Sequence, residues 1–232
     1  MEAQAIIRAE NLGKSFQLGQ EEIVILKDIN LAVRQGEFVS IMGPSGSGKS
    51  TLLYLIGGLD QPTTGRIRIK GKELYGMKDR EGSILRRREL GFVFQFYNLI
   101  PNLNVEENIM LPILLDGKRM KAERRKLERI LADVGLSDRR RHTPRELSGG
   151  QQQRVAIARA LVNEPDIILA DEPIGNLDSQ TGTEIMKLLQ RISREYGKTV
   201  VQVTHSQEAA AYGDRIIHVR DGKVWDHDEK VV

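Results

Sequence analysis

The chain has 232 residues, an apolar fraction of 40% and a net charge of +3 from 35 basic and 32 acidic side chains. This length fits one domain with a possible inserted subdomain, and the lack of cysteine excludes disulfides, thiolate metal sites and cysteine nucleophiles. No apolar run approaches the roughly 18 residues that a membrane span needs, and Met1 to Gln4 do not resemble the start of a signal peptide. We therefore expect a cytoplasmic protein without a membrane span of its own.

The N-terminal part of the chain predicts short strands. Apolar and polar residues alternate roughly at 6–12 and 29–33 and cleanly at 66–70, whereas 37–42 is an almost continuous apolar run, typical of a buried strand. We expect a small antiparallel β layer laid against a core built around the buried strand.

A glycine-rich loop, Gly43 to Thr51, follows the buried strand and precedes a predicted helix that begins near Leu52. Its glycines let consecutive N–H groups point into one hollow, and the following helix adds its positive end, so the loop favours polyanions. Lys49 can then reach the β- and γ-phosphates of a nucleotide, and Ser50 can offer its hydroxyl to Mg²⁺. A simple turn would explain the glycines but neither of these two side chains.

The rest of the chain predicts helices and buried strands in alternation. We expect strands at 90–94, 167–170 and 199–203, a helical stretch from 104 to about 162, a helix around 185–192 and a terminal hairpin of 215–219 with 223–225. Helices that alternate with buried strands predict a parallel sheet. The basic clusters near 86–88, 118–129 and 139–142 contain no interleaved aromatics, so we interpret them as solvated helix faces and expect no direct contact with nucleic acid.

Two acidic residues, Asp171 and Glu172, follow the predicted strand at 167–170. Asp171 can hold Mg²⁺, and Glu172 is placed to polarise a water molecule for attack on the γ-phosphate. The alternative is an acidic strand end that pairs with a lysine or caps a helix, but the glycine loop in the same chain favours the catalytic interpretation.

The sequence Leu-Ser-Gly-Gly-Gln at 147–151 opens another predicted helix. Ser148 and Gln151 have the spacing of a capping box. This leaves Gly149 and Gly150 unexplained, and two glycines at the start of a helix can expose amide groups to a second anion.

Taken together and in this order, the motifs resemble the nucleotide-binding subunit of ABC transporters, and more narrowly the MacB, LolD and BceA group. The resemblance rests on the glycine loop, Gln95, the motif at 147–151, Ala170-Asp171-Glu172-Pro173, Asn176-Leu177-Asp178 and His205. It implies an α/β fold with a P-loop NTPase core, a mainly parallel sheet, an N-terminal antiparallel β subdomain and an inserted helical subdomain. The expected division is a helical subdomain at about 96–162, with 1–95 and 163–232 forming the rest of a single domain.

The resemblance also implies a role for each matching position. Phe16 would stack on adenine; Gln95 would meet Mg²⁺ and the attacking water; and His205 would contact the γ-phosphate beside Glu172. Asp178 would lie at a dimer interface, and Ile174, where the group usually has threonine, is the clearest departure. The expected ATP contacts besides Phe16 are Gly43, Pro44, Ser45, Gly46, Ser47, Gly48, Lys49, Ser50 and Thr51, and those made to the ATP of a second copy are Leu147, Ser148, Gly149, Gly150 and Gln151.

These residues predict an ATP-hydrolysing subunit that forms a head-to-tail dimer around two ATP·Mg²⁺ and drives a separate membrane permease from the cytoplasmic face. The substrates handled by the resembling group suggest export or extraction of peptides, antibiotics or lipoproteins. The alternatives are a soluble ABC ATPase that acts on DNA or ribosomes and a P-loop kinase. The first lacks its usual coiled coils or second cassette here, and the second would leave the motif at 147–151 and His205 without a use.

Overall fold

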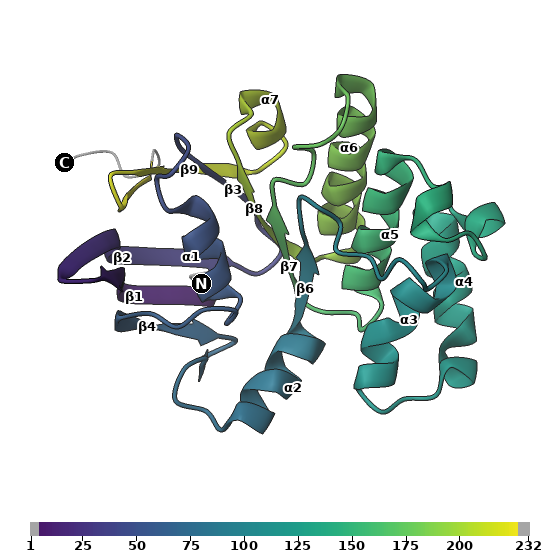
Figure 1. Ribbon diagram of the computed structural model, residues 1–232, viewed down its shortest axis with the longest axis horizontal. Helices are drawn as coiled ribbons and strands as arrows, with labels where there is room; N and C mark the ends of the chain where they lie inside the picture. Colours follow the sequence, from purple (N-terminus) through teal and green to yellow (C-terminus); the bar gives the residue numbers. More distant parts are fainter. Residues whose placement is uncertain (1–4, 227–232) are drawn as a thin grey trace.

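Two β-sheets form the framework of the computed structural model, which describes residues 5–226 (Figure 1). The smaller sheet is antiparallel with the strand order β2-β1-β4-β5, and the larger has the order β10-β9-β3-β8-β7-β6. The strands are β1 (Ala5–Leu18), β2 (Glu21–Arg34), β3 (Phe38–Met42), β4 (Thr64–Ile69), β5 (Lys72–Glu73), β6 (Leu90–Val93), β7 (Ile167–Asp171), β8 (Thr199–Thr204), β9 (Arg215–Arg220) and β10 (Lys223–Asp226). Met1 to Gln4, on which the signal-peptide expectation depends, lie outside the described residues.

The helices cover the larger sheet on both faces. Helix α1 lies between the two sheets, whereas α5 and α6 lie on the other side of β7 and β8, with α3 and α4 beyond them (Figure 1). The helices are α1 (Lys49–Ile56), α2 (Asp79–Glu89), α3 (Val105–Leu115), α4 (Arg124–Asp133), α5 (Gly149–Leu161), α6 (Ser179–Tyr196) and α7 (Gln207–Ala210), with short 3₁₀ turns at Met120–Glu123, Ser137–Arg139 and Pro144–Glu146. Among the residues described, no helix is both long and apolar enough to span a bilayer.

Two hydrophobic cores lie on opposite faces of the larger sheet. Alternate residues of β7 point to opposite sides, so Leu169 packs with Leu52 and Leu53 of α1, while Ile168 packs with Ile157 of α5. One sheet thus keeps the helix that follows the glycine loop apart from the helix that begins at 149.

The central strands are the part of the fold that the sequence predicts best. Every residue of β3, β7 and β8 is buried, and the pairs β3/β8, β7/β8 and β6/β7 are parallel. Strands covered on both faces have nearly continuous apolar sequences, which is why the expected strands at 37–42, 167–170 and 199–203 are confirmed. The mainly parallel sheet, the antiparallel sheet and the helical segment between β6 and β7 match the expected fold class, and the terminal hairpin β9–β10 is also confirmed.

The hairpin of β1 and β2 and the helix α2 differ from expectation, because their sequences carry little apolar periodicity. Strands β1 and β2 extend well beyond 6–12 and 29–33 and meet at Gly19, whose φ is 64°. The outer part of this hairpin is exposed, including its apolar side chains Leu18 and Val24. Helix α2 was not predicted, since only Gly82 and Leu85 among its residues are buried.

The basic residues near 86–88 were expected to form a solvated helix face, but only Arg88 is exposed and the other two are half-buried. Arg88 Nε lies 3.1 Å from Asp116 Oδ1, and Lys118 Nζ lies 3.3 Å from the other oxygen of this carboxylate. Arg87 donates a hydrogen bond to the carbonyl oxygen of Leu115. These contacts fasten α2 to the end of α3, so this part of the basic surface has an internal structural use.

Candidate functional site

The glycine loop connects the end of β3 to the start of α1. Gly46 and Gly48 have φ values of 77° and 96°, which other residues adopt only at a cost in energy. A Cβ built on Gly43 would lie 2.1 Å from the carbonyl oxygen of Val219, so β9 also requires a glycine there. The loop therefore has the tight curvature that turns backbone N–H groups toward a bound anion.

Lys49 is buried at 7% exposure inside this loop. Its Nζ donates a hydrogen bond of 2.8 Å to the carbonyl oxygen of Pro44. The hydroxyl of Ser47 is also buried and has no hydrogen-bond partner among the described residues. In the described part of the chain, the buried Lys49 ammonium is thus bound to a neutral acceptor, and the Ser47 hydroxyl has no acceptor or donor. Both groups are suited to bind phosphate oxygens.

Asp171 ends β7 and receives two hydrogen bonds from α1. Ser50 Oγ donates to Oδ1 at 2.9 Å and Tyr54 OH donates to Oδ2 at 2.7 Å. Burial raises the pKa of Tyr54 to about 12, and the bond to Asp171 acts in the same direction, so the phenol keeps its proton at neutral pH. The structure thus brings together two of the three expected Mg²⁺ ligands, Ser50 and Asp171, and it adds Tyr54, which the sequence analysis did not identify.

This pair of oxygen donors fits Mg²⁺. The ion prefers hard oxygen ligands and is usually held by one or two carboxylates together with substrate phosphates. A hydroxyl and a carboxylate 2.9 Å apart at the base of the glycine loop supply the protein part of such a set. No group of three or more acidic, histidine or cysteine side chains gathers elsewhere in the described part of the chain to form an all-protein metal site.

Glu172 and His205 meet beside Asp171. His205 Nδ1 lies 2.9 Å from Glu172 Oε1, and the side chains are 69% and 15% exposed, respectively. Their proximity follows from the sheet, since β7 and β8 are neighbours with Asp171 opposite Val203. Glu172 has a φ of 46°, and its N–H donates to the carbonyl oxygen of Val203 at 3.0 Å. Such a conformation costs about 1–3 kcal/mol and is often found at functional sites.

Gln95 follows β6 and pairs with Asn176, which follows β7. Asn176 Nδ2 donates to the backbone oxygen of Gln95 at 3.0 Å, and Gln95 Nε2 lies 3.4 Å from Asn176 Oδ1. The Gln95 side chain is therefore held by this neighbouring loop. The next residues, Tyr97 and Asn98, have positive φ values, and both of their carbonyl oxygens accept hydrogen bonds from Arg159 of α5.

The motif at 147–151 forms the start of α5. The expected capping box is present: Gln151 N–H donates to Ser148 Oγ at 3.3 Å, and Ser148 N–H donates to Gln151 Oε1 at 3.0 Å. The structure also shows why neighbouring side chains require glycine at 149 and 150, which the sequence alone did not reveal. A Cβ on Gly149 would lie 2.9 Å from Tyr97 OH, and one on Gly150 would lie 2.3 Å from Thr181 Cγ2.

Gln153 joins this helix to the segment after Glu172. The side chain is completely buried, and its Nε2 donates a hydrogen bond of 2.7 Å to the carbonyl oxygen of Pro173. Asp178, in the same segment, caps α6 by accepting from Thr181 N–H at 3.0 Å. Its bonds with Thr181 hold the pKa of the Asp178 carboxyl below its usual range.

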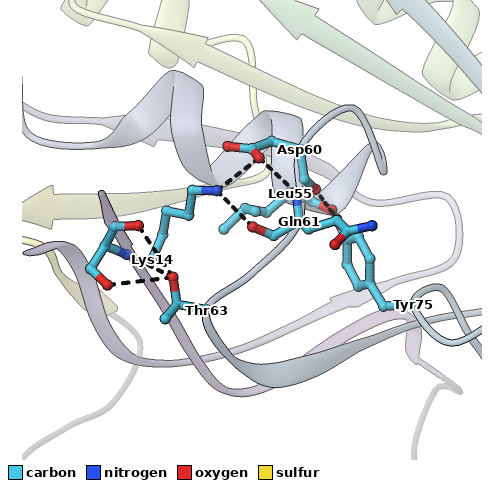
Figure 2. A network of polar contacts seen from close by, with 7 residues as sticks. Lys14, Leu55, Asp60, Gln61, Thr63 and Tyr75 are labelled. Carbon is cyan, nitrogen blue, oxygen red and sulfur yellow. Dashed lines mark hydrogen bonds and ion pairs between the residues drawn. The ribbon is translucent and has the colours of Figure 1, made fainter. Parts of the chain in front are cut away.

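Phe16 lies on β1 in the outer half of the hairpin, with 47% of its surface exposed. Lys14 Nζ lies 4.6 Å from the centre of its ring. Figure 2 shows that this ammonium also reaches the loop after α1, where it lies 2.8 Å from both Asp60 Oδ1 and the Gln61 carbonyl oxygen. The strand that carries Phe16 is thus attached to the helix that follows the glycine loop.

A groove of about 550 Å³ lies between α2, β6, α3 and the end of α5, and three arginines, Arg86, Arg87 and Arg159, contribute to its lining. Its lining includes Phe92, Phe94, Leu111 and Leu115. Phe96, which follows Gln95, is 73% exposed. Phe94 lines the groove and Phe96 is exposed, so apolar side chains flank Gln95 in the sequence.

The site residues fall into two groups. The glycine loop, Ser50, Asp171, Glu172 and His205 meet at the carboxyl-terminal ends of β3, β7 and β8. The start of α5 instead contacts Tyr97, Leu177 and Thr181, and within the described part of the chain no hydrogen bond joins residues 147–151 to the glycine loop.

Comparison with known proteins gives consistent matches over almost the whole chain. The family model described as ABC transporter matches residues 26–175. The chain is 51% identical to the lipoprotein-releasing system ATP-binding protein LolD of Aquifex aeolicus over 219 residues, covering 94% of this chain and 96% of that protein. It is 47% identical to the macrolide export ATP-binding/permease protein MacB of Rhodopseudomonas palustris, covering 96% of this chain but 34% of that longer protein.

A solved structure agrees in fold as well as in sequence. The dimeric, post-hydrolysis structure of the ATP-binding cassette MJ0796 of Methanocaldococcus jannaschii, bound to ADP and Pi, superposes with a TM-score of 0.86 at 50% identity. The match covers 94% of this chain and 96% of that one.

Proposed function

Because this chain belongs to the ABC transporter family, and is an ATPase of that family, we propose that two copies bind two ATP·Mg²⁺ head to tail and drive a separate membrane permease. One observation carries the proposal: Ser50, Asp171, Glu172 and His205 adjoin one another at the mouth of the glycine loop, joined by contacts of 2.9 Å.

Binding of ATP begins with its phosphates. The N–H groups of the loop face the anion, and the Lys49 ammonium exchanges the Pro44 carbonyl oxygen for the β- and γ-phosphate oxygens. The exchange is favourable because a hydrogen bond between two charged groups is stronger than one to a neutral carbonyl. Ser50, Asp171 and Gln95 would hold Mg²⁺, which neutralises phosphate charge when bound. Phe16 would stack on the adenine.

Hydrolysis requires a base beside the γ-phosphate. The Glu172 carboxylate takes a proton from the attacking water as the water oxygen bonds to phosphorus and the bond to the ADP oxygen breaks. His205 holds Glu172 Oε1 from the neighbouring strand, and it is exposed enough to contact the γ-phosphate as well. Both side chains come from the ends of packed strands, which favours a preorganised site.

The second half of each site would come from the other copy. The core packing assigns α1 and α5 to opposite faces of the sheet, which supports contact between residues 147–151 and the nucleotide of a partner. ATP then stabilises the closed dimer because it touches both copies only in that state. Asp178 would lie at the same interface.

The closing of the dimer would be transmitted to a permease through the groove that Phe94, next to Gln95, helps to line. We propose that a cytoplasmic segment of the permease docks on the apolar lining and the exposed Phe96, which would hold the chain at the cytoplasmic face of the membrane. Residues 96–162 would form a helical subdomain that lines one side of this groove, with 1–95 and 163–232 as the rest of the domain. The names of the LolD and MacB relatives favour the release of lipoproteins or the export of macrolide antibiotics, and the resemblance of the motifs adds peptides as a further substrate class.

Replacement of Glu172 with glutamine tests the assignment. Glu172→Gln keeps the shape of the side chain but removes the base, so steady-state phosphate release should fall by on the order of 10²–10⁴-fold. ATP should still bind, and a dimer should accumulate on size-exclusion chromatography only when ATP is present.

Glu195→Gln is the matched control, because Glu195 is an exposed glutamate on α6. It should behave like the wild type in both measurements. Unchanged turnover in Glu172→Gln would remove Glu172 from the mechanism, whereas lost turnover without an ATP-dependent dimer would contradict the sandwich. Purification from solubilised membranes should recover a permease; ribosomes or DNA in its place would favour the soluble alternative.

A further inference from the structure

The carboxylate of Asp171 is held at both of its oxygens by one helix. Ser50 Oγ donates to Oδ1 at 2.9 Å, and Tyr54 OH donates to Oδ2 at 2.7 Å. Ser50 and Tyr54 are four residues apart on α1, so they lie one turn apart on the same face of the helix. The carboxylate, 8% exposed, therefore bridges two turns of the helix that follows the glycine loop.

The orientation of this carboxylate is not set by its own side chain. The terminal torsion of aspartate has a broad, two-fold distribution, so the plane of the carboxylate is fixed by the groups that bind its oxygens. Ser50 alone would leave Oδ2 free to rotate. A second donor at Oδ2 fixes the plane and keeps Oδ1 turned toward Ser50.

We propose that Tyr54 is a positioning residue for the metal site: its hydroxyl holds Asp171 so that Oδ1 and Ser50 Oγ are directed at Mg²⁺. The inference rests on the proposed function, in which Ser50 and Asp171 hold that ion. Tyr54 itself touches neither nucleotide nor metal and acts through the carboxylate. Groups that orient a metal ligand in this way are typically worth about 10–100-fold in metal affinity or activity.

A merely structural role makes a different prediction. Tyr54 is partly buried between α1 and β7, so its hydrogen bond could serve only to attach the helix to the strand. Loss of the hydroxyl would then lower the unfolding temperature without changing the requirement for Mg²⁺. The two roles are separated by comparing ATP binding with and without the metal.

The test measures ATP affinity by calorimetry in excess Mg²⁺ and again in EDTA, together with the Mg²⁺ concentration that gives half-maximal hydrolysis. Tyr54→Phe keeps the ring and removes only the hydroxyl. We expect its affinity in EDTA to match the wild type, its affinity in Mg²⁺ to fall, and its half-maximal Mg²⁺ concentration to rise by about tenfold.

Tyr75→Phe is the matched control. Tyr75 OH lies within hydrogen-bond distance of the backbone oxygens of Asp60, at 2.6 Å, and of Leu55, so the substitution removes a comparable hydroxyl that contacts the far end of the same helix. It should lower the unfolding temperature and leave the Mg²⁺ dependence unchanged. Equal Mg²⁺ dependence in Tyr54→Phe and Tyr75→Phe, or an equal loss of affinity by Tyr54→Phe in EDTA, would overturn the proposal.

Asp171→Asn separates this proposal from the function on which it rests. If Asp171→Asn raises the Mg²⁺ requirement and Tyr54→Phe does not, only the role of Tyr54 is wrong. If neither substitution does so, the metal site itself is wrong. Binding of Mn²⁺ with ATP, followed by electron paramagnetic resonance, gives a second readout that does not depend on turnover.

Discussion

The ring of Phe16 is supported from one side before any nucleotide arrives. Lys14 Nζ lies 4.6 Å from its centre and is held in turn by Asp60 and by the Gln61 carbonyl oxygen. A cation over the face of an aromatic ring is attracted to the π electrons, so an adenine base would stack on the opposite face. Phenylalanine gives this stacking without the hydrogen bond of a tyrosine hydroxyl.

Substitution of this ring should weaken ATP binding. Base–aromatic stacking is worth about 1–3 kcal/mol, so Phe16→Ala should raise the dissociation constant for ATP by about 5–150-fold, as measured by calorimetry. Phe16→Tyr should keep wild-type affinity. Leu18→Ala is the control, since Leu18 is a still more exposed apolar side chain on the same hairpin, at 68%. If ATP affinity is the same in Phe16→Ala and Leu18→Ala, Phe16 does not contact the base.

The sequence identifies the glycine loop, Asp171 and Glu172 because each lies directly after a buried strand, where spacing along the chain shows which end of the sheet they occupy. It does not identify Tyr54, whose contact depends on the rotation of α1 against β7. The sequence does not reveal the pairing of Gln95 with Asn176 either. These residues follow two strands that are neighbours in the sheet but far apart in the sequence.

The start of α5 shows how one short motif meets two sets of constraints. The capping box satisfies the N–H groups of Ser148 and Gln151, and the two glycines allow Tyr97 and Thr181 to approach the helix. A requirement for glycine is therefore not by itself proof that these residues bind an anion.

A double substitution can separate packing from nucleotide binding at Gly150. Gly150→Ala would place its Cβ 2.3 Å from Thr181 Cγ2, and such overpacking costs about 1–3 kcal/mol. Thr181→Ser removes that methyl group, after which the nearest Thr181 atom would be 3.7 Å away. We expect the single variant to lose stability and turnover, and Gly150→Ala/Thr181→Ser to regain both. Thermal unfolding that recovers while turnover stays low would instead show that Gly150 must be bare for the nucleotide.

At the level of elements, predictability follows burial. The strands β3, β7 and β8 are recognisable because both of their faces are covered, which leaves apolar runs in the sequence. The outer half of the β1–β2 hairpin and helix α2 are not, because their structure depends on neighbouring elements more than on their own periodicity. Helix α2 is stabilised partly by bonds from Arg87 and Arg88 to the end of α3.

The whole molecule presents the glycine loop and the start of α5, the two surfaces that we propose bind nucleotide, in different places. The larger sheet separates the cores that hold α1 and α5, and this separation is the main reason to expect each ATP site to be shared between two copies. A shared site has a consequence that can be tested with inactive chains.

Mixing Lys49→Ala with Ser148→Arg should restore hydrolysis. Each variant alone forms dimers in which both sites are defective, whereas the mixed dimer has one site with an intact loop and an intact partner motif. An equal mixture should therefore recover hydrolysis, to at most about a quarter of the wild-type rate, since half of the dimers are mixed and each of these has one intact site out of two. Phosphate release measures the recovery.

A second mixture provides the control. In the proposed dimer Lys49 and Glu172 serve the same nucleotide from the same chain, so Lys49→Ala with Glu172→Gln leaves no intact site in any dimer and should stay inactive. Recovery in both mixtures, or in neither, would contradict the shared arrangement.

In such a dimer the buried hydrogen bond between Gln153 and Pro173 would connect the two ATP sites. It connects the helix that approaches one ATP to the segment beside the glutamate that serves the other ATP. In each subunit the side chain of Gln153 therefore links the two nucleotide sites. We therefore expect the release of phosphate at one ATP site to affect the other site through this hydrogen bond. The two hydrolysis events of the dimer would then follow one another and would not be independent.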